Sequence, residues 1–273
     1  MAADKALVPA WIVGEFSGTF LLVLFGCGSV AAAVLTGAQV GIFQVAIVWG
    51  LGIATAIYLT GSLSGAHLNP AVTLALAAAG RLPFRRAPGY VLMQFLGAFC
   101  ASGALYALFA GPLRAFESAN GIVRGAPGSE ASAMVFGEFY PNPAWHQGAA
   151  AVVSPGAAFL VEVTGAAVLC LVVLCVTDPR NRSHPGPLTA ATIGLTITML
   201  ISLFGPLTMA GFNPARDFAP RLFSALAGWG GLVFRVNGAG WLVVYIVAPL
   251  AGGLAGALAY RLFFQPNYRA ETA

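Results

Sequence analysis

The chain has 273 residues, of which 59% are hydrophobic and only 8% are charged, and its formal net charge is +4. A soluble domain carries about 25% charged residues, so this composition excludes an ordinary globular surface. The small positive charge does not indicate a nucleic-acid partner, because the basic residues lie between apolar segments.

Six apolar segments are each long enough to cross a bilayer as a helix, which takes about 20 residues. The first contains Glu15 and the fourth contains Glu162, and the others carry no charge. Because the first segment is long and contains a glutamate, we do not expect a cleaved signal peptide. The sequence therefore predicts an all-α, multi-pass membrane protein with spans at Ile12–Leu35, Ile42–Thr60, Ala87–Ala110, Pro155–Thr177, Pro187–Phe204 and Ala239–Tyr260.

The distribution of basic residues predicts the orientation of these spans. With six crossings both termini lie on one side, which carries Lys5, Arg81, Arg85, Arg86, Arg180, Arg182, Arg261 and Arg269. The other side carries Arg114, Arg124 and Arg235, with Arg216 and Arg221 in a segment described below. Lysine and arginine are more frequent in cytoplasmic loops, so we expect cytoplasmic termini and a place in the cell membrane.

The chain also contains an internal repeat. Glu15 is followed after 54 residues by Asn69, and Glu162 is followed after 51 residues by Asn213; an Asn-Pro-Ala triplet begins at each asparagine. Each half has three spans, so the two halves have opposite topology. Inverted repeats with short interrupted segments at matching positions indicate a transport site between them. We therefore assign one channel domain (1–273), made of repeats 10–110 and 155–265 and an extracellular connection, 111–154.

Each Asn-Pro-Ala triplet predicts the start of a half-helix, because asparagine is a favoured N-cap and proline a favoured first helical residue. As a helix, Asn69–Gly80 measures about 18 Å, roughly half the hydrocarbon core, and Asn213–Leu226 is similarly short. Inverted symmetry brings the two starts together near the midplane, where non-helical backbone is tolerated only along a cavity or inside the protein. We expect a pore centre at Asn69 and Asn213, structural roles for Pro70 and Pro214, and pore lining by Gly65, Ala66, His67, Gly211 and Phe212.

The chemistry of this centre favours small neutral solutes. Two positive helix ends oppose cations and protons, while the asparagine amides can donate to a hydroxyl or water oxygen. Arg216 stands in the first turn of the second half-helix, where the helix dipole opposes a cation and favours Asp217. We therefore expect Arg216 to line a constriction, where it binds polar solutes and repels cations, and Asp217 to be structural.

Glu15 and Glu162 are acids inside predicted spans, and such acids are by default candidates for ion or proton transport. The alternative is structural, with each carboxylate accepting backbone N–H bonds from the loop before its own half-helix. The matching positions of the two glutamates in the repeat favour this scaffold role.

Two longer stretches, SGAHLNPAVTLA and GFNPARDFAPRLF, resemble the paired signatures of the aquaporin superfamily. The Asn-Pro-Ala-Arg-Asp run, GWG at 228–230 and YPNPAW at 140–145 resemble its glycerol-facilitator branch. The similarity runs from Gly14 to Arg261 and implies a channel with six spans and two re-entrant half-helices, usually a homotetramer. It also implies an aromatic wall at Trp49 and a selectivity filter of Trp49, Ile201, Ala210 and Arg216.

This filter departs from the branch at two positions. A glycerol facilitator commonly has a second aromatic residue where this chain has Ala210, and a glycine where it has Ile201. Phe212 either refills the space beside Ala210 or packs elsewhere. A water-selective filter would have a histidine near Ile201, and none is present.

Together these features predict a passive channel for small uncharged polyols, with glycerol as the favoured solute and some water. The alternatives are a water-selective channel, a channel for urea or neutral metalloid hydroxides, and an ion-coupled secondary transporter. An enzyme is disfavoured, because no paired nucleophile and base lies at membrane depth. We expect no cofactor and no metal; the expected partners are the solute, water and the lipid bilayer.

Overall fold

A computed structural model of the chain describes residues 7–38, 41–144 and 152–268, and within them every regular element is a helix. Lys5, Trp145 and Arg269 lie outside these residues. Six of the described helical segments are long and apolar enough to cross a membrane, which confirms the predicted number of spans. They are α1 (Ala10–Thr36), α2 (Ile42–Ser64), Phe84–Leu108 with α4 (Ala87–Leu108), α7 (Pro155–Val176), Gly186–Thr208 with α8 (Thr189–Thr208), and Gly240–Tyr268 with α10 (Gly240–Leu242) and α11 (Ala248–Ala259).

The last span continues beyond the predicted end at Tyr260. It runs through a π turn at Tyr260–Phe264 and ends in a 3-10 turn that closes at Tyr268. Arg261 interrupts the apolar run in the sequence, but its guanidinium donates to the carbonyl oxygen of Ala78 at 3.1 Å. A charge with a hydrogen-bond partner near the end of a span therefore does not stop the helix.

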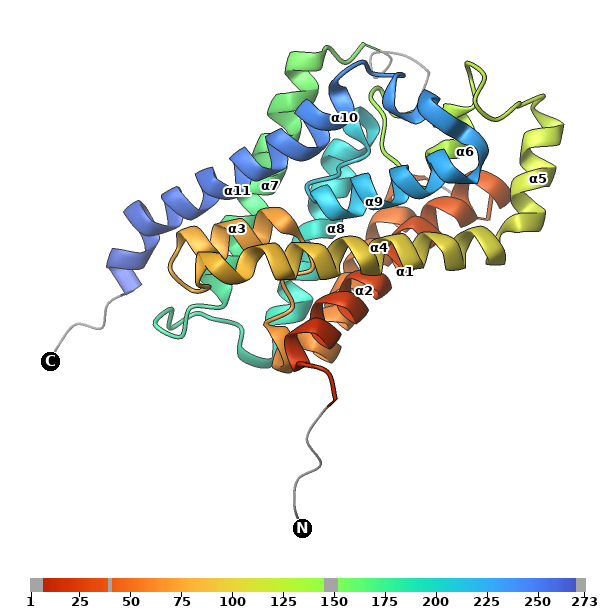
Figure 1. Cartoon of the computed structure of the whole chain (residues 1–273). Helices are drawn as coiled ribbons and strands as arrows, with labels where there is room; N and C mark the ends of the chain where they lie inside the picture. Colours follow the sequence, from red (N-terminus) through yellow and green to blue (C-terminus); the bar gives the residue numbers. More distant parts are fainter. Residues whose placement is uncertain (1–6, 39–40, 145–151, 269–273) are drawn as a thin grey trace, which may run out of the picture.

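Two short helices, α3 (Pro70–Ala78) and α9 (Pro214–Ser224), lie among the six spans (Figure 1). Each packs against a span of the other half of the chain: α3 against α11, and α9 against α4. The helix α9 ends two residues before its predicted end at Leu226. The chain then turns through Gly228, whose φ of +114° is one that glycine tolerates best.

Glycines allow the long helices to cross closely, both between the two halves and within each half. A Cβ on Gly50 of α2 would lie 2.5 Å from the carbonyl oxygen of Gly194 on α8, and a Cβ on Gly194 would lie 2.3 Å from that of Gly50. A Cβ on Gly97 of α4 would lie 2.3 Å from the carbonyl oxygen of Phe16, and one on Gly252 of α11 would lie 2.3 Å from that of Val163. Larger residues at these crossings would separate the helices that surround the half-helices.

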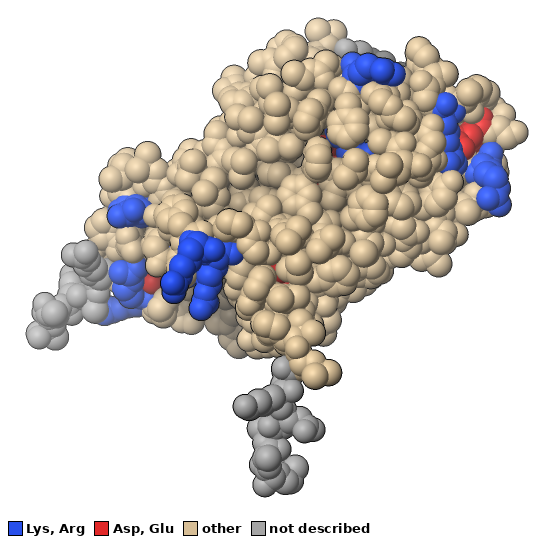
Figure 2. Space-filling view, in the orientation of Figure 1, with Lys and Arg blue, Asp and Glu red and all other residues tan. Residues whose placement is uncertain are grey.

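The connection between the halves carries α5 (Ala110–Ala119) and α6 (Glu130–Ala133), which gather at one end of the bundle (Figure 1). Arg124 stabilises the connection at this end. The Arg124 Nε lies 2.9 Å from a Glu117 carboxylate oxygen, and the guanidinium lies 4.2 Å from the ring centre of Trp229. Residues 132–140 then return into the bundle and are buried. On the face shown in Figure 2, most charged side chains lie toward the two ends, with a largely uncharged band between them.

Candidate functional site: a pore between two re-entrant loops

The loop before α3 is held by Glu15 of α1, whose side chain is fully buried. The Glu15 carboxylate accepts hydrogen bonds from the Ser64 hydroxyl at 2.6 Å and from the backbone N–H groups of His67 and Leu68, each at 2.9 Å. The two N–H donors lie in a loop without helical hydrogen bonds of its own, and Ser64 ends the helix before it. The carboxylate therefore supplies the acceptors that the bilayer interior would not.

The loop before α9 is held in the same way by Glu162 of α7, which is also fully buried. Its carboxylate accepts hydrogen bonds from the Thr208 hydroxyl at 2.6 Å and from the N–H groups of Gly211 at 3.0 Å and Phe212 at 2.7 Å. The donors are equivalent in type and order to those around Glu15. Each glutamate thus contacts the loop before the half-helix of its own repeat.

Both loops adopt left-handed backbone at positions where residues with a side chain rarely do so. The φ values are +86° at Gly65, +49° at Ala66, +53° at Leu68, +65° at Met209, +62° at Ala210 and +51° at Phe212. For residues other than glycine such conformations cost of order 1–3 kcal/mol each and persist only where the surroundings enforce them. The hydrogen bonds to the two glutamates provide that enforcement, and the repeated pattern indicates a backbone shaped for function.

The two asparagines join the loops to each other. The Asn69 amide nitrogen donates to the carbonyl oxygen of Phe212, and the Asn213 amide nitrogen donates to that of Leu68, each at 2.9 Å. Their side-chain oxygens cap α3 and α9 by accepting from N–H groups of the first turn. Each amide nitrogen carries two hydrogens, so one remains after the bond to the opposite loop.

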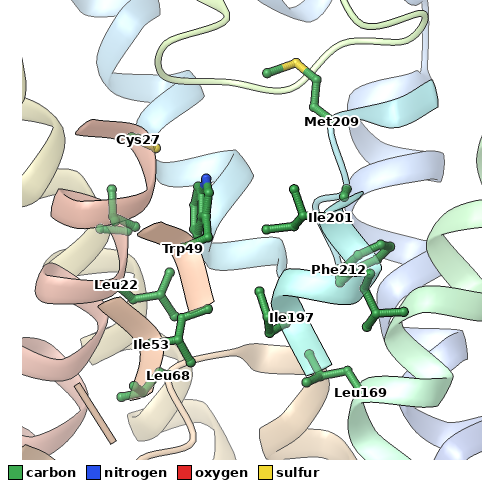
Figure 3. Close-up of a cluster of buried hydrophobic side chains, with 14 of the residues drawn as sticks. Leu22, Cys27, Trp49, Ile53, Leu68, Leu169, Ile197, Ile201, Met209 and Phe212 are labelled. Carbon is green, nitrogen blue, oxygen red and sulfur yellow. The ribbon is translucent and has the colours of Figure 1, made fainter. Parts of the chain in front are cut away.

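Two cavities meet at three of the four predicted filter residues. The central cavity is lined by both loops, both asparagines and the apolar side chains of α1, α2, α7 and α8, and the vestibule cavity is lined by the connection and the adjoining ends of α1, α2 and α8. Trp49, Ile201 and Arg216 line both, and Ala210 lines the central cavity. In Figure 3 the side chain of Ile201 points toward the Trp49 ring. These residues mark the boundary between the two cavities.

The Trp49 ring and the Arg216 guanidinium lie in contact at this boundary. The Arg216 Cζ lies 4.6 Å from the ring centre, and both side chains are buried. The ring occupies space left by Gly26 of α1, where a Cβ would lie 2.3 Å from its carbons. An aromatic face and a guanidinium attract each other electrostatically, which helps to fix both.

Arg216 belongs to a charged cluster between α9 and the connection. Its Nε lies 2.9 Å from a carboxylate oxygen of Glu138, and its Nη1 donates to the carbonyl oxygen of Phe136 at 3.3 Å. One residue further on, Asp217 lies 2.7 Å from the Arg221 guanidinium. Its carboxylate also accepts from the backbone N–H of Glu138 at 2.7 Å, so Asp217 links α9 to the connection.

Comparison with known proteins agrees with this geometry. Residues 5–260 match the family model described as "Major intrinsic protein". The chain belongs to the major intrinsic protein family. It is 44% identical over 251 residues to the glycerol uptake facilitator protein of Pseudomonas aeruginosa, covering 92% of this chain and 87% of that one. It is 40% identical over 254 residues to a propanediol uptake facilitator of Salmonella typhimurium, covering 93% of each.

A solved structure of a family relative has the same fold. The aquaglyceroporin from Plasmodium falciparum superimposes with a TM-score of 0.77 at 28% identity, covering 95% of this chain and 98% of that one. The expected fold of six spans and two re-entrant half-helices is therefore confirmed for this member of the family.

The remaining residues predicted to line the pore have distinct surroundings. Gly65, Ala66, His67, Gly211 and Phe212 all contribute to the central cavity. The His67 ring lies 3.3 Å from the Thr73 hydroxyl and 4.7 Å from the ring centre of Tyr90. The Phe212 ring is buried against Gly165 of α7, where a Cβ would lie 2.0 Å from it, and against the Phe204 ring of α8. It packs between helices and is not a second aromatic beside Trp49.

Glu138 is another buried acid at this site, beside Glu15 and Glu162, and it was not predicted from the sequence. Glu138 is the single charge in the stretch from Ala131 to Trp145. A lone acid in an otherwise uncharged part of a long connection was the available signal. Among the described residues, no group of three or more His, Cys, Asp or Glu side chains could hold a metal ion.

Proposed function

We propose that this chain is a passive channel for small uncharged polyols, with glycerol as the favoured solute, and that it also conducts water. The boundary between the two cavities carries the proposal. Trp49 and Ile201 supply apolar surface there, and Arg216 supplies charged N–H donors. A polyol has carbon and hydroxyl groups along one chain, so such a constriction suits it.

The path beyond the constriction likewise combines apolar side chains with polar groups. Apolar side chains of α1, α2, α7 and α8 line the central cavity, and the two loops line it as well; Figure 3 shows Leu22, Ile53, Leu169 and Ile197. We propose that loop carbonyl oxygens accept from the solute hydroxyls. The uncommitted N–H of Asn69 and that of Asn213 then donate to solute oxygens at the pore centre.

Ions are excluded by charge and by the cost of losing water. The N-terminal ends of α3 and α9 each carry roughly half a positive charge, and they meet where the asparagines bond to opposite loops. Arg216 adds donors with positive charge at the constriction. No bond is made or broken in this transport, so the protein is a channel and not an enzyme.

The hydrogen bonds of Glu15 and Glu162 count against the ion-coupled alternative. Each carboxylate already accepts from a hydroxyl and two backbone N–H groups. A coupled carrier would need one of these acids to release its partners during every cycle. We propose instead that both remain fixed, together with Pro70 and Pro214.

Orientation and assembly complete the proposal. The excess of arginine on the side of the termini supports cytoplasmic ends, with the vestibule cavity facing outward. Family resemblance supports a homotetramer with one pore in each subunit.

Shrink–swell light scattering on proteoliposomes tests the function directly. After a glycerol shock the vesicles should shrink and then re-swell rapidly, with a rate that rises linearly with glycerol concentration. A sucrose shock of equal osmolarity should cause shrinkage alone and report water flux. Water flux without glycerol re-swelling would contradict the polyol assignment and favour a water channel.

A further inference from the structure

We propose that Glu138 is a specificity-determining residue of this channel. It positions the Arg216 side chain and neutralises its charge, so that the arginine acts on passing polyols as a hydrogen-bond donor and not as a bare cation. This inference deepens the proposed polyol channel and rests on it.

The first observation is the isolation of the Glu138 carboxylate. Its side chain is fully buried, and one oxygen lies 2.9 Å from the Nε of Arg216. Among the described residues, neither carboxylate oxygen receives a well-directed hydrogen bond. A buried charge without such bonds depends on a charged partner for its stability. Arg216 is that partner.

The second observation is the space that the sequence leaves for this carboxylate. Its other oxygen lies beside Gly211, where a Cβ would approach to 2.1 Å. Any other residue at position 211 would push the carboxylate away from its place. The Glu162 carboxylate also lies beside Gly211, but it already accepts hydrogen bonds from three donors of its own. It therefore does not compete for Arg216.

The third observation is the way in which the backbone of Glu138 is held. Its N–H donates to Asp217 at 2.7 Å, and its carbonyl oxygen accepts from the guanidinium of Arg221. Asp217 and Arg221 are themselves an ion pair on α9. The helix that carries Arg216 therefore also fixes the residue that neutralises it, and the two side chains keep their relative position.

The consequence concerns the donors that face the solute. A guanidinium has five N–H groups; the contact with Glu138 engages Nε, and Phe136 takes one hydrogen of Nη1. The other three remain for a solute at the boundary that Arg216 lines. With Glu138 ionised, these donors belong to a neutral pair. Without the Glu138 charge, the three Arg216 donors belong to an uncompensated cation. Such a cation would bind a polyol with several hydroxyls more strongly than a single water.

The test compares glycerol flux with water flux in the same proteoliposomes, because their ratio does not depend on how much protein folds. We expect Glu138→Gln to lower the glycerol-to-water ratio at least threefold. Glu138→Asp keeps the charge and should restore most of the wild-type ratio. The matched control is Glu117→Gln, which removes another paired carboxylate of the same connection, the partner of Arg124, and should leave the ratio unchanged.

A second variant tests the contact if Glu138→Gln yields no folded protein. Gly211→Ala should lower the ratio as Glu138→Gln does, because the added methyl displaces the carboxylate. Adding Gly211→Ala to Glu138→Ala should cause no further change. A wild-type ratio in Glu138→Gln, or fully additive effects of the two substitutions, would overturn this inference. Absence of glycerol flux in the wild type and in Glu117→Gln would instead overturn the proposed function.

Discussion

The two re-entrant loops share a scaffold but differ in charge. Each has a buried glutamate, a hydroxyl residue and an asparagine N-cap at matching places. Where the second half-helix has Arg216 and Asp217, the first has Val72 and Thr73. In the first half the Gln94 amide nitrogen donates to Glu15 at 2.7 Å and to Thr73 at 2.9 Å, so a neutral amide contacts these groups in place of a full positive charge.

This difference separates two tasks. The shared parts bend both loops into the same left-handed backbone and bring the two asparagines together. The unshared charges of α9 reach the connection at the boundary between the central and vestibule cavities, where we propose the filter. The loop hydrogen bonds thus follow the repeat, while the proposed filter charge belongs to one half only, and substitutions should divide into the same two classes.

The largest effect is expected from removing the shared scaffold. Glu15→Ala and Glu162→Ala each leave a hydroxyl and two backbone N–H groups without an acceptor, and each such buried donor costs about 1–3 kcal/mol. We expect both variants to lose most of the folded protein, or to melt about 10 °C lower or more. Fluorescence-detected size exclusion after heating measures this.

The comparison between these two variants is informative in itself. Equal losses would agree with a symmetric scaffold. A variant with wild-type melting but no flux would place that glutamate in transport and break the equivalence of the loops. Glu130→Ala is a suitable control, because that carboxylate lies in the connection and, among the described residues, accepts a hydrogen bond only from Gly128.

The next effect is expected from making the second loop resemble the first. Arg216→Val introduces the residue found at the matching position, Val72, and leaves Glu138 buried without its partner. Breaking a buried ion pair in this way costs about 3–5 kcal/mol. We expect lower thermal stability and a proton leak, measured with a pH-sensitive dye inside vesicles.

A double variant separates the two consequences of that change. Adding Glu138→Gln to Arg216→Val removes the unpaired charge, so stability should recover while the leak remains. If the thermal stability recovers and the proton leak disappears in the same variant, the leak came from a damaged fold and not from loss of the filter charge.

A smaller effect is expected from exchanging the apolar filter residues. Ala210→Phe adds an aromatic ring beside a constriction that Ile201 already narrows, so glycerol flux should fall several-fold while water flux falls less. Combining it with Ile201→Gly restores the volume and should restore glycerol flux. If the single and double variants conduct glycerol equally, Ile201 and Ala210 do not share the constriction.

Most of the fold could be predicted from the sequence because its signals are local. Uncharged runs give the spans, and an asparagine followed by proline gives the start of each half-helix. The contact of Glu138 with Arg216 could not be predicted, since it joins residues in different segments through an irregular connection. The Phe212 ring was equally ambiguous, because its direction depends on the space that Gly165 leaves on another helix.

The smallest effect is expected at Gln94, which belongs to the first loop alone. Gln94→Leu removes two hydrogen bonds but leaves Glu15 with Ser64 and two N–H groups. Hydrogen bonds between membrane helices are worth about 0.6 kcal/mol on average, so the melting temperature should fall by only a few degrees. Glycerol and water flux per folded protein should stay unchanged, because the proposed filter charge belongs to the second half-helix. A shifted glycerol-to-water ratio in this variant would show that the neutral loop also contributes to selection.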